Sequence, residues 1–313
     1  LACGKADDLA LTTILASTKQ TILVPAMNTK MWLNKFTQNN FRRLLENGFL
    51  NIGPVEGSLA CGEKGEGRMS NSEDIAEYLK NYFLYKNIAK KLKLRALVTA
   101  GPTREYIDPV RFISNESSGK QGYEIASSLA NMGVETTLIS GPTNLHKPYD
   151  VKLVQVTSGK EMLIETQKHL PVDIAVCSAA VSDYVPINYS KKKMKKKQNE
   201  NVNFKKNEDI LEFLSKNNFQ RPRLVVGFSA ETEKLIEHSI QKKDNKNCDW
   251  IVGNDISNKK IGFNSDFNSV SIINHKNEIE SIEKNSKKYI ANIISKRIID
   301  HFAKKNIHGK SIN

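Results

Sequence analysis

The sequence has 313 residues, of which 39% are hydrophobic, and its formal net charge at pH 7 is +13. This length suffices for a substantial core and predicts about two domains. No apolar run reaches the roughly 18 residues of a membrane span, which excludes a helical membrane span. The four cysteines are widely spaced and form no cluster of the zinc-binding type. This cysteine pattern excludes a common zinc site and favours a reduced, cytoplasmic protein.

Residues 1–90 predict half of an α/β unit. The apolar pattern indicates a helix over 1–17, a strand over 21–26, a helix around 34–47 and a strand around 50–53. Two strands bury too little surface to be stable alone. The segment 81–95 predicts a helix tail followed by a basic linker, so we place a boundary near residue 90 and divide the chain into domains 1–89 and 90–313.

From residue 95 onward, strands and helices alternate as in a doubly wound, Rossmann-like α/β domain. Apolar runs predict strands over 95–100, 134–140, 173–180, 223–231 and 248–255. Helices are predicted around 123–132, 159–169, 208–216 and 231–243, followed by a hairpin over 269–283 and a closing helix over 287–305. Because these strands show little alternation, we expect helices on both faces of the sheet, and ligands outside the carboxyl ends of its strands.

Four motifs follow predicted strands at this end of the sheet, and each has two interpretations. The loop GPTREYIDPVRFISNESSGKQG is typical either of an anion-binding loop before a helix or of an ordinary connection. Asp183 either accepts hydrogen bonds from a ligand or caps local structure. Phe228 either stacks on a base or packs in the core. Lys242 and Lys246, four residues apart, either contact phosphates or lie on a solvated helix face.

The cluster KKKMKKK (191–197) is typical of a nucleic-acid patch, a solvated loop or a loop that supplies one cation to a small-molecule site. The positive net charge suggests an anionic partner. Arginine, the usual residue for reading bases and phosphates, is nevertheless scarce relative to lysine. We therefore favour solvated lysines over a nucleic-acid interface.

Taken in order, TAGPTREYIDPVRFISNESSGKQG, SAAVSDY, the lysine cluster, VGFSAET and the closing ND with GFNSD closely resemble phosphopantothenate–cysteine ligase. This enzyme is the second half of the bifunctional coenzyme A biosynthesis flavoprotein, and the resemblance covers about residues 95–300. It implies that CTP, with Mg²⁺, activates the carboxylate of 4′-phosphopantothenate as an acyl-cytidylate and releases pyrophosphate. The amine of cysteine then displaces CMP and forms 4′-phosphopantothenoylcysteine. The motifs assign no Mg²⁺ ligands.

The resemblance also carries residue roles to this sequence. Lys193, ten residues after Asp183, is expected to be the catalytic lysine, with the rest of the cluster solvated. Arg111 and Asn115 are expected to handle the acyl-cytidylate and its conversion to product. The remaining expected contacts are the cytidine-binding turn (Cys177, Ser178, Ala179, Asp183), the stretch Glu208, Asp209, Ile210 and Leu211, and the base and phosphate contacts Phe228, Lys242 and Lys246. Glu208 stands where the family's pattern has proline.

The N-terminal motifs GKADDL, PAMNTKMW and EGSLACGEKGEGRM are similar to phosphopantothenoylcysteine decarboxylase, an FMN enzyme. The resemblance implies that Asn28 holds the substrate carboxylate and that Cys61, on a glycine-flanked flap, protonates the enethiol intermediate. The family's catalytic histidine and flavin-phosphate loop lie upstream of these motifs, and none of the six histidines precedes residue 146. Because the sequence also opens inside a predicted helix without an initiator methionine, we expect an N-terminally truncated chain that does not decarboxylate by itself.

The resemblance further implies a homo-oligomer, with a dimer formed through the ligase domain and a higher assembly through the decarboxylase domain. Two other functions remain as alternatives. A nucleotide-dependent reductase on the same sheet needs a GxGxxG fingerprint, which the sequence lacks. A basic nucleic-acid-binding protein would use the positive charge, and its affinity would fall steeply with salt. We expect neither nucleic acid nor membrane as a partner.

Overall fold

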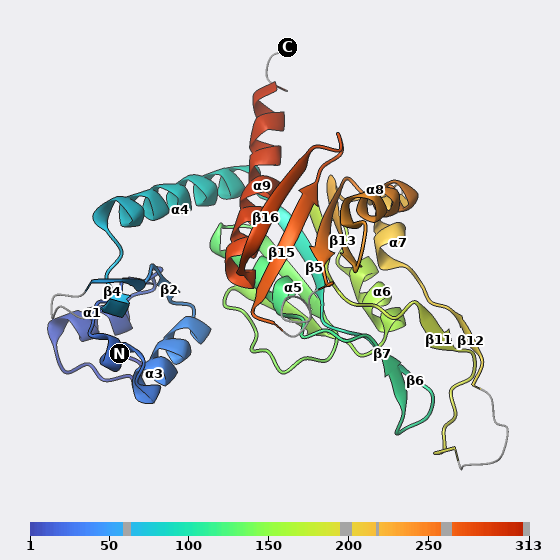
Figure 1. Cartoon of the computed structure of the whole chain (residues 1–313), viewed down its shortest axis with the longest axis horizontal. Helices are drawn as coiled ribbons and strands as arrows, with labels where there is room; N and C mark the ends of the chain where they lie inside the picture. Colours follow the sequence, from blue (N-terminus) through green and yellow to red (C-terminus); the bar gives the residue numbers. More distant parts are fainter. Residues whose placement is uncertain (59–63, 195–201, 217–218, 258–264, 309–313) are drawn as a thin grey trace. The chain divides into compact units, whose positions relative to one another are not determined.

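The computed structural model describes residues 1–58, 64–194, 202–216, 219–257 and 265–308. The chain forms two compact units, Leu1–Tyr85 and Lys86–Asn313 (Figure 1). The division falls within one continuous helix, α4 (Ser72–Leu92), where the sequence predicts a helix tail and then a linker. The helix continues because this segment holds no glycine or proline and is rich in residues with good helix propensity. It ends at Leu92, and the next residue, Lys93, has a φ of 49°.

The first unit combines short helices with two small strand pairs. Its elements are α1 (Leu9–Ala16), β1 (Ile22–Leu23), α2 (Thr29–Trp32), α3 (Lys35–Glu46), β2 (Leu50–Asn51), β3 (Val55–Ser58) and β4 (Lys64–Arg68). β1 pairs in parallel with β2, and β3 pairs antiparallel with β4. Among the described residues of this unit, Trp32, Leu50 and Ile52 are the buried hydrophobic side chains. The predicted order of helices and strands is confirmed, with α1 starting later than predicted, after its N-cap Asp8.

The second unit is built on an eight-stranded sheet with the order β16-β15-β14-β13-β10-β5-β8-β9. Its parallel strands are β5 (Arg95–Ala100), β8 (Glu135–Ser140), β9 (Val151–Gln155), β10 (Ile174–Cys177), β13 (Leu224–Glu231) and β14 (Trp250–Asp255). An antiparallel hairpin, β15 (Phe267–Ile273) and β16 (Ile279–Ser286), extends one edge. The chain runs from β5 to β8 and β9, and then returns to the other side of β5 with β10. The doubly wound fold is confirmed, and its strand order reverses between β5 and β10.

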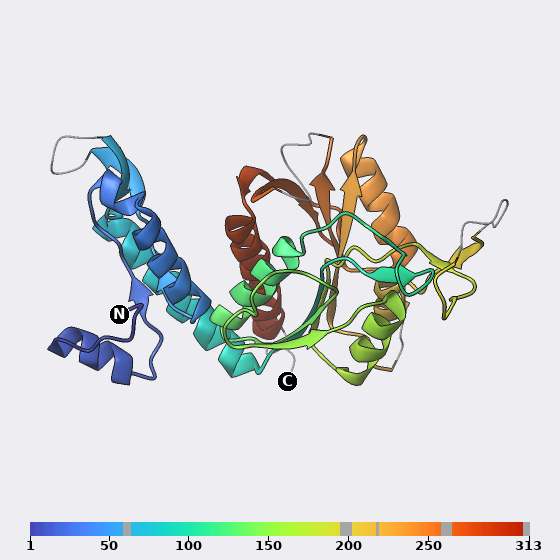
Figure 2. The same cartoon turned by 90° about the horizontal axis from the view of Figure 1, so that it is seen from below.

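Helices cover both faces of this sheet, as the sequence predicts (Figure 2). α5 (Lys120–Asn131) and α9 (Lys287–His308) lie on one face, and α6 (Gly159–Lys168), α7 (Ile210–Lys216) and α8 (Leu235–Lys246) lie on the other. Met162 of α6 and Leu214 of α7 pack in one core cluster with Leu97, Ala175 and Val225 of the central strands. In the part of the chain that the structure describes, no helix is long and apolar enough to cross a bilayer.

Two antiparallel ribbons project from the carboxyl end of the sheet (Figure 1). They are β6 (Arg104–Tyr106) with β7 (Phe112–Ser114), and β11 (Tyr184–Pro186) with β12 (Phe204–Lys206). We call these ribbons and the described residues between their strands the arm. The Ser190 N–H joins the ribbons by donating to the carbonyl of Ile107 over 3.0 Å. Each strand has three residues, too few to produce a pattern, and the sequence predicts loops in their place.

Gly122 lets α5 approach the end of β5. A Cβ atom at this position would lie 2.4 Å from Ser178 Oγ and 2.6 Å from Ala100 Cβ. Gly122→Ala should therefore lower the free energy of unfolding by about 1–3 kcal/mol, even though alanine favours helix more than glycine does. Urea denaturation measures this change. Ser127→Ala on the same helix is the control and should have little effect, whereas an unchanged stability of Gly122→Ala would contradict the close packing.

Candidate active site

A cavity of about 320 Å³ opens at the carboxyl ends of β5, β10 and β13, where the strand order reverses. One part of its lining is the loop before α5, with Asn115 and residues 117–122. Another part is the turn after β10, and Phe228 and Lys242 also line the space. This is the end of the sheet at which the sequence predicts a ligand.

A second cavity, of about 130 Å³, shares part of this lining, namely Ala179, Val181, Asp183, Phe228 and Lys242. Most of the residues that the sequence predicts for the ligase site line one or both cavities. They are Asn115, Cys177, Ser178, Ala179, Asp183, Glu208, Asp209, Ile210, Leu211, Phe228 and Lys242. Arg111, Lys193 and Lys246 line neither cavity.

The turn after β10 is held by the end of β5. Ser178 donates to the carbonyl of Thr99 through its backbone N–H, over 3.2 Å, and through its hydroxyl, over 2.7 Å. Asn115 Nδ2 donates to the carbonyl of Val181 in the same turn, over 3.0 Å. The turn that the resemblance assigns to cytidine is therefore a fixed part of the cavity wall.

Asp183 contributes a carboxylate to the lining of both cavities. Its backbone carbonyl accepts a hydrogen bond from the Asn207 N–H over 2.8 Å. Its side chain has no hydrogen-bond partner or ion pair within the described ranges, and the residue precedes a strand, β11, rather than a helix. The interpretation of Asp183 as a cap is therefore wrong, and its carboxylate is available to accept hydrogen bonds from a ligand.

Phe228 and Lys242 lie where the two cavities meet. Phe228 is half-buried, so its ring is not enclosed in the core. Lys242, on α8, forms no ion pair with any residue of the described segments. An accessible aromatic ring beside an unpaired ammonium group suits a base with an attached phosphate.

Lys246 differs from its predicted place. Its Nζ lies 2.8 Å from Asp209 Oδ2 and 3.0 Å from Glu212 Oε2. The hydrogen bond with Asp209 is the main cause that raises the pKa of Lys246. This lysine therefore joins α8 to the start of α7. The spacing of Lys242 and Lys246 shows that they share a helix face, but it does not show which neighbour each one meets.

Cys177 and Cys248 are thiols without nucleophilic character. Burial raises the pKa of Cys177 above its usual range and that of Cys248 to about 11. Both side chains therefore stay protonated at neutral pH, and only a thiolate would be a nucleophile. Cys177 contributes to the wall of the second cavity, and Cys248 packs in the core cluster beneath α7.

The larger cavity is also lined by two lysines that are not among the predicted site residues. Lys287, the first residue of α9, is 6% exposed, and it lines the cavity together with Lys120 of α5. Lys120 forms an ion pair with Asp266. Burial, and then the charge of Lys120, lower the pKa of Lys287 to about 8. No motif marks Lys287, because packing of α9 against α5 brings it to the cavity from the far end of the domain.

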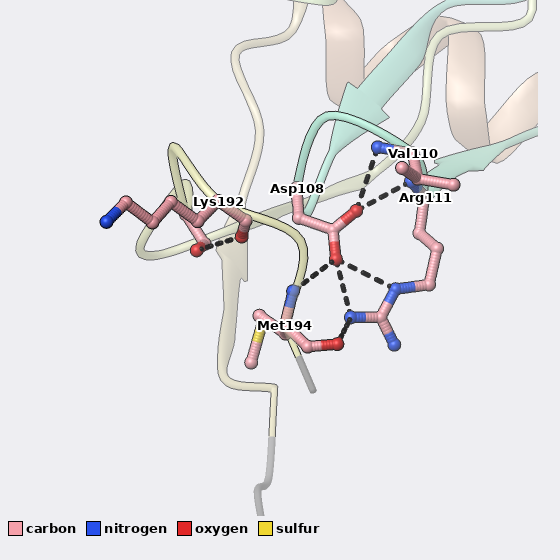
Figure 3. A network of polar contacts seen from close by, with 6 residues as sticks. Asp108, Val110, Arg111, Lys192 and Met194 are labelled. Carbon is pink, nitrogen blue, oxygen red and sulfur yellow. Dashed lines mark hydrogen bonds and ion pairs between the residues drawn. The ribbon is translucent and has the colours of Figure 1, made fainter. Parts of the chain in front are cut away.

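Arg111 and Lys193 lie on the arm. Asp108, buried in the turn between β6 and β7, accepts hydrogen bonds from the Arg111 side chain and from the Met194 N–H (Figure 3). The Arg111 side chain is the main cause that holds the pKa of Asp108 well below its usual range. Lys193 is exposed. The structure thus brings Arg111 close to the main chain beside Lys193, but it brings neither residue to the cavity of its own chain.

In the first unit, two predicted decarboxylase motifs pack together. The Met27 N–H donates to the carbonyl of Gly67 over 2.9 Å. Asn28 caps α2, because its Oδ1 accepts a hydrogen bond from the Lys30 N–H over 2.8 Å. Cys61 lies outside the described residues.

The fold and the cavities define a doubly wound α/β protein with a polar ligand site at the reversal of its strand order. Residues 92–302 match the family described as DNA/pantothenate metabolism flavoprotein C-terminal domain, and residues 1–84 match the family described as flavoprotein. The chain belongs to the family of coenzyme A biosynthesis bifunctional proteins.

Two relatives and one solved structure illustrate this membership. The coenzyme A biosynthesis bifunctional protein CoaBC of Vibrio cholerae serotype O1 is 38% identical over 276 residues, which are 87% of this chain and 68% of that protein. CoaBC of Haemophilus influenzae is 38% identical over 306 residues, which are 97% of this chain and 75% of that protein. A crystal structure of the C-terminal domain of CoaBC is 36% identical, with a TM-score of 0.57, and the match covers 67% of this chain and 96% of that one.

Proposed function

We propose that the second unit catalyses the CTP-dependent ligation of 4′-phosphopantothenate and cysteine through an acyl-cytidylate. Membership of the coenzyme A biosynthesis family supports this reaction class. The observation that carries the proposal is the pair of joined cavities at the strand-order reversal. They place the ring of Phe228 and the carboxylate of Asp183 around one space with Lys120, Lys242 and Lys287.

The lysines answer the main electrostatic demand of this reaction. Activation brings a carboxylate against a triphosphate, so cations must offset the repulsion and the charge that develops at the reacting phosphorus. Lys242 and Lys287 provide such cations, and the positive end of the α5 dipole lies beside residues 117–120 of the lining. In this arrangement Phe228 stacks on the cytosine, and Asp183 accepts hydrogen bonds from the nucleoside.

Mg²⁺ supplies further positive charge at the triphosphate when it is bound. Within the described part of the chain, no cluster of three or more His, Cys, Asp or Glu side chains could hold a metal ion. Mg²⁺ is commonly held by substrate phosphates and water with one or two carboxylates. We therefore propose that it enters as a complex with CTP.

For the first unit we propose the family's second reaction, the FMN-dependent decarboxylation of 4′-phosphopantothenoylcysteine to 4′-phosphopantetheine in the complete protein. Asn28 would hold the substrate carboxylate, and Cys61 would protonate the enethiol intermediate. The contact between Met27 and Gly67 supports this proposal, because it fixes the Asn28 loop against β4. FMN supplies the redox chemistry when bound, and the protein's share is binding and orientation. Loss of CO₂ release in Asn28→Asp, measured on the FMN-loaded complete protein, tests the role.

We also propose that a second copy of the chain covers the arm. Exposed apolar side chains gather there, namely Val110, Phe112, Tyr184, Ile187, Tyr189 and Phe204. A dimer would bury this surface and could bring Arg111 and Lys193 to the cavity of the neighbouring subunit. Light scattering should give the mass of a dimer for the wild type and of a monomer for Tyr184→Glu. A monomeric wild type at micromolar concentration would contradict the proposal.

Pyrophosphate release tests the ligase reaction directly. Release should require 4′-phosphopantothenate and should be clearly faster with CTP than with ATP. Equal use of ATP, or release without the acid, would contradict the proposed function. A nucleic-acid-binding protein would instead show a steep loss of polynucleotide affinity with salt, which filter binding measures.

Lys287 predicts a pH dependence of substrate binding. Because its ammonium form is lost as the pH rises through about 8, the KM for 4′-phosphopantothenate should increase above this pH. Lys287→Arg keeps its charge and should remove the increase, whereas Lys287→Met should have a high KM at every pH. The folded protein binds fewer protons than the unfolded chain between about 8 and 10.5, so this residue makes the free energy of unfolding rise with pH across that range.

A further inference from the structure

We propose that Asp108 is a positioning residue for the ligase reaction, because its buried carboxylate fixes the Arg111 side chain and the main chain beside Lys193 in one arrangement. The inference rests on the proposed function, in which Arg111 and Lys193 act on the acyl-cytidylate and its formation. Asp108 itself lines neither cavity, so its effect on the reaction is exerted through these two residues.

The Asp108 carboxylate uses both of its oxygens. Oδ1 accepts from the backbone N–H groups of Val110 and Arg111, each over 2.9 Å, which closes the turn between β6 and β7. Oδ2 accepts from Arg111 Nε over 2.9 Å and from Arg111 Nη2 over 2.5 Å. Oδ2 also accepts from the Met194 N–H over 3.1 Å, across 86 positions of sequence. One side chain therefore links the turn, a cation and the middle residue of the lysine cluster (Figure 3).

The burial of Asp108 makes this link rigid. Asp108 is 0% exposed, and a buried carboxylate is costly unless donors surround it. The donors hold the pKa of Asp108 well below its usual range, with the Arg111 side chain as the main cause, so the carboxylate stays charged at every pH at which an enzyme is assayed. The Arg111 side chain is 50% exposed, so the pair joins a buried anchor to an accessible cation.

The fold of the arm does not depend on this link alone. The ladders of β6 with β7 and of β11 with β12 hold each ribbon, and the bond from the Ser190 N–H to the carbonyl of Ile107 joins the two main chains. Asp108 adds the orientation of a particular cation. Because Nε and Nη2 of Arg111 are engaged, Nη1 is the edge of the guanidinium that has no partner in the described parts of the chain. This edge can donate two hydrogen bonds to an anionic substrate group.

Asp108→Asn is the first test. The amide has a similar shape, but its nitrogen cannot accept from Arg111 or Met194. Single-turnover formation of acyl-cytidylate should fall by about 10²-fold, the loss typical of a displaced reacting group. The KM for CTP should stay within about twofold, since the cavity residues are untouched, and Asp108→Glu should recover part of the rate. Glu165→Gln removes the ion pair with Lys168 on α6 and is the matched control, with no expected change.

Hydrogen–deuterium exchange provides a readout that does not depend on activity. The Met194 amide should exchange about five- to tenfold faster in Asp108→Asn, as expected for one lost hydrogen bond, while the amides of β10 and β13 keep their protection. An unchanged exchange rate of the Met194 amide would show that Asp108 does not anchor the main chain there. This result would hold even if the wild type proved to have no ligase activity. Faster exchange with an unchanged rate of acyl-cytidylate formation would overturn the positioning role.

A second variant covers the case in which Asp108→Asn does not fold. Met194→Pro removes the N–H that donates to Oδ2, at a residue outside helices and strands. It also fixes φ at this position and restricts the backbone of Lys193, so a fully active variant is the informative outcome. The substitution should slow acyl-cytidylate formation by at least about tenfold, because the main chain beside Lys193 loses its anchor. A fully active Met194→Pro enzyme would overturn the proposal. A wild type without CTP-dependent pyrophosphate release would instead refute the proposed function.

Discussion

Replacement of Lys193 by glutamine is expected to abolish acyl-cytidylate formation almost completely. The attacking carboxylate and the triphosphate are both anions, and a positioned ammonium group lowers their repulsion where the new bond forms. Loss of one preorganised donor of this kind costs about 10²–10³ in kcat. Single-turnover assays with CTP and 4′-phosphopantothenate, in the absence of cysteine, measure this step by itself.

Lys191→Gln is the matched control for this experiment. Lys191 belongs to the same cluster and is exposed, and the charge of an exposed lysine usually contributes little. We expect its rate to stay within about twofold of the wild type, because its solvated charge is screened. Similar losses in both variants would show that the cluster acts through its total charge, and the role of Lys193 would then be wrong.

Asn115→Asp is expected to separate the two steps of the reaction. The new carboxylate faces the cavity in which the acyl phosphate forms, so its charge hinders attack by the cysteine amine. It also cannot donate to the carbonyl of Val181, which Asn115 Nδ2 contacts over 3.0 Å. Pyrophosphate should still be released, whereas amide formation should fall by about 10²–10³. Rapid-quench analysis should detect acyl-cytidylate accumulating.

Asn144→Asp provides the control for the added charge. Asn144 is exposed on the loop after β8 and lines neither cavity. Its substitution should leave both steps unchanged. If pyrophosphate release and amide formation fall in parallel in Asn115→Asp, the residue does not act after activation, and its assigned role is wrong.

The central strands and the residues at their carboxyl ends could be predicted from the sequence. β10 and β13 have helices on both faces, so nearly every position is apolar and the strands are visible as runs. Parallel strands end at one edge of a sheet, which is why Ser178 and Asp183, in the turn after β10, meet Phe228 of β13 although it is far away in the chain. Chain order was therefore enough to place these residues together.

Other features depend on contacts that no local pattern records. β9 lies at the edge of the sheet with Lys152 and Gln155 exposed, so it has no continuous apolar run and was not predicted. Lys287 reaches the cavity through the packing of α9 on α5 and through its N–H, which donates to the carbonyl of Asp266 over 2.9 Å. Lys246 binds Asp209, which the helical spacing does not reveal.

The motif that contains Arg111 and Asn115 shows that residues close together in the sequence need not lie at the same site. Its residues are contiguous in sequence, which suggests one site. β7 lies between the two residues, and four steps of extended chain separate them by about 13 Å. Asn115 therefore lines the cavity while Arg111 lies out on the arm.

β16 ends the eight-stranded sheet with main-chain groups that face outward. An exposed edge of this kind is a template onto which strands of other molecules can add, and therefore a route to aggregation. Glu283 and Lys284 are exposed along β16, and Glu280 accepts hydrogen bonds of 2.7 and 2.8 Å from Arg297 of α9. These charges make the addition of an apolar strand unfavourable. Concentrated protein should therefore self-associate through the arm, and substitutions in the arm should alter solubility more than substitutions in β16.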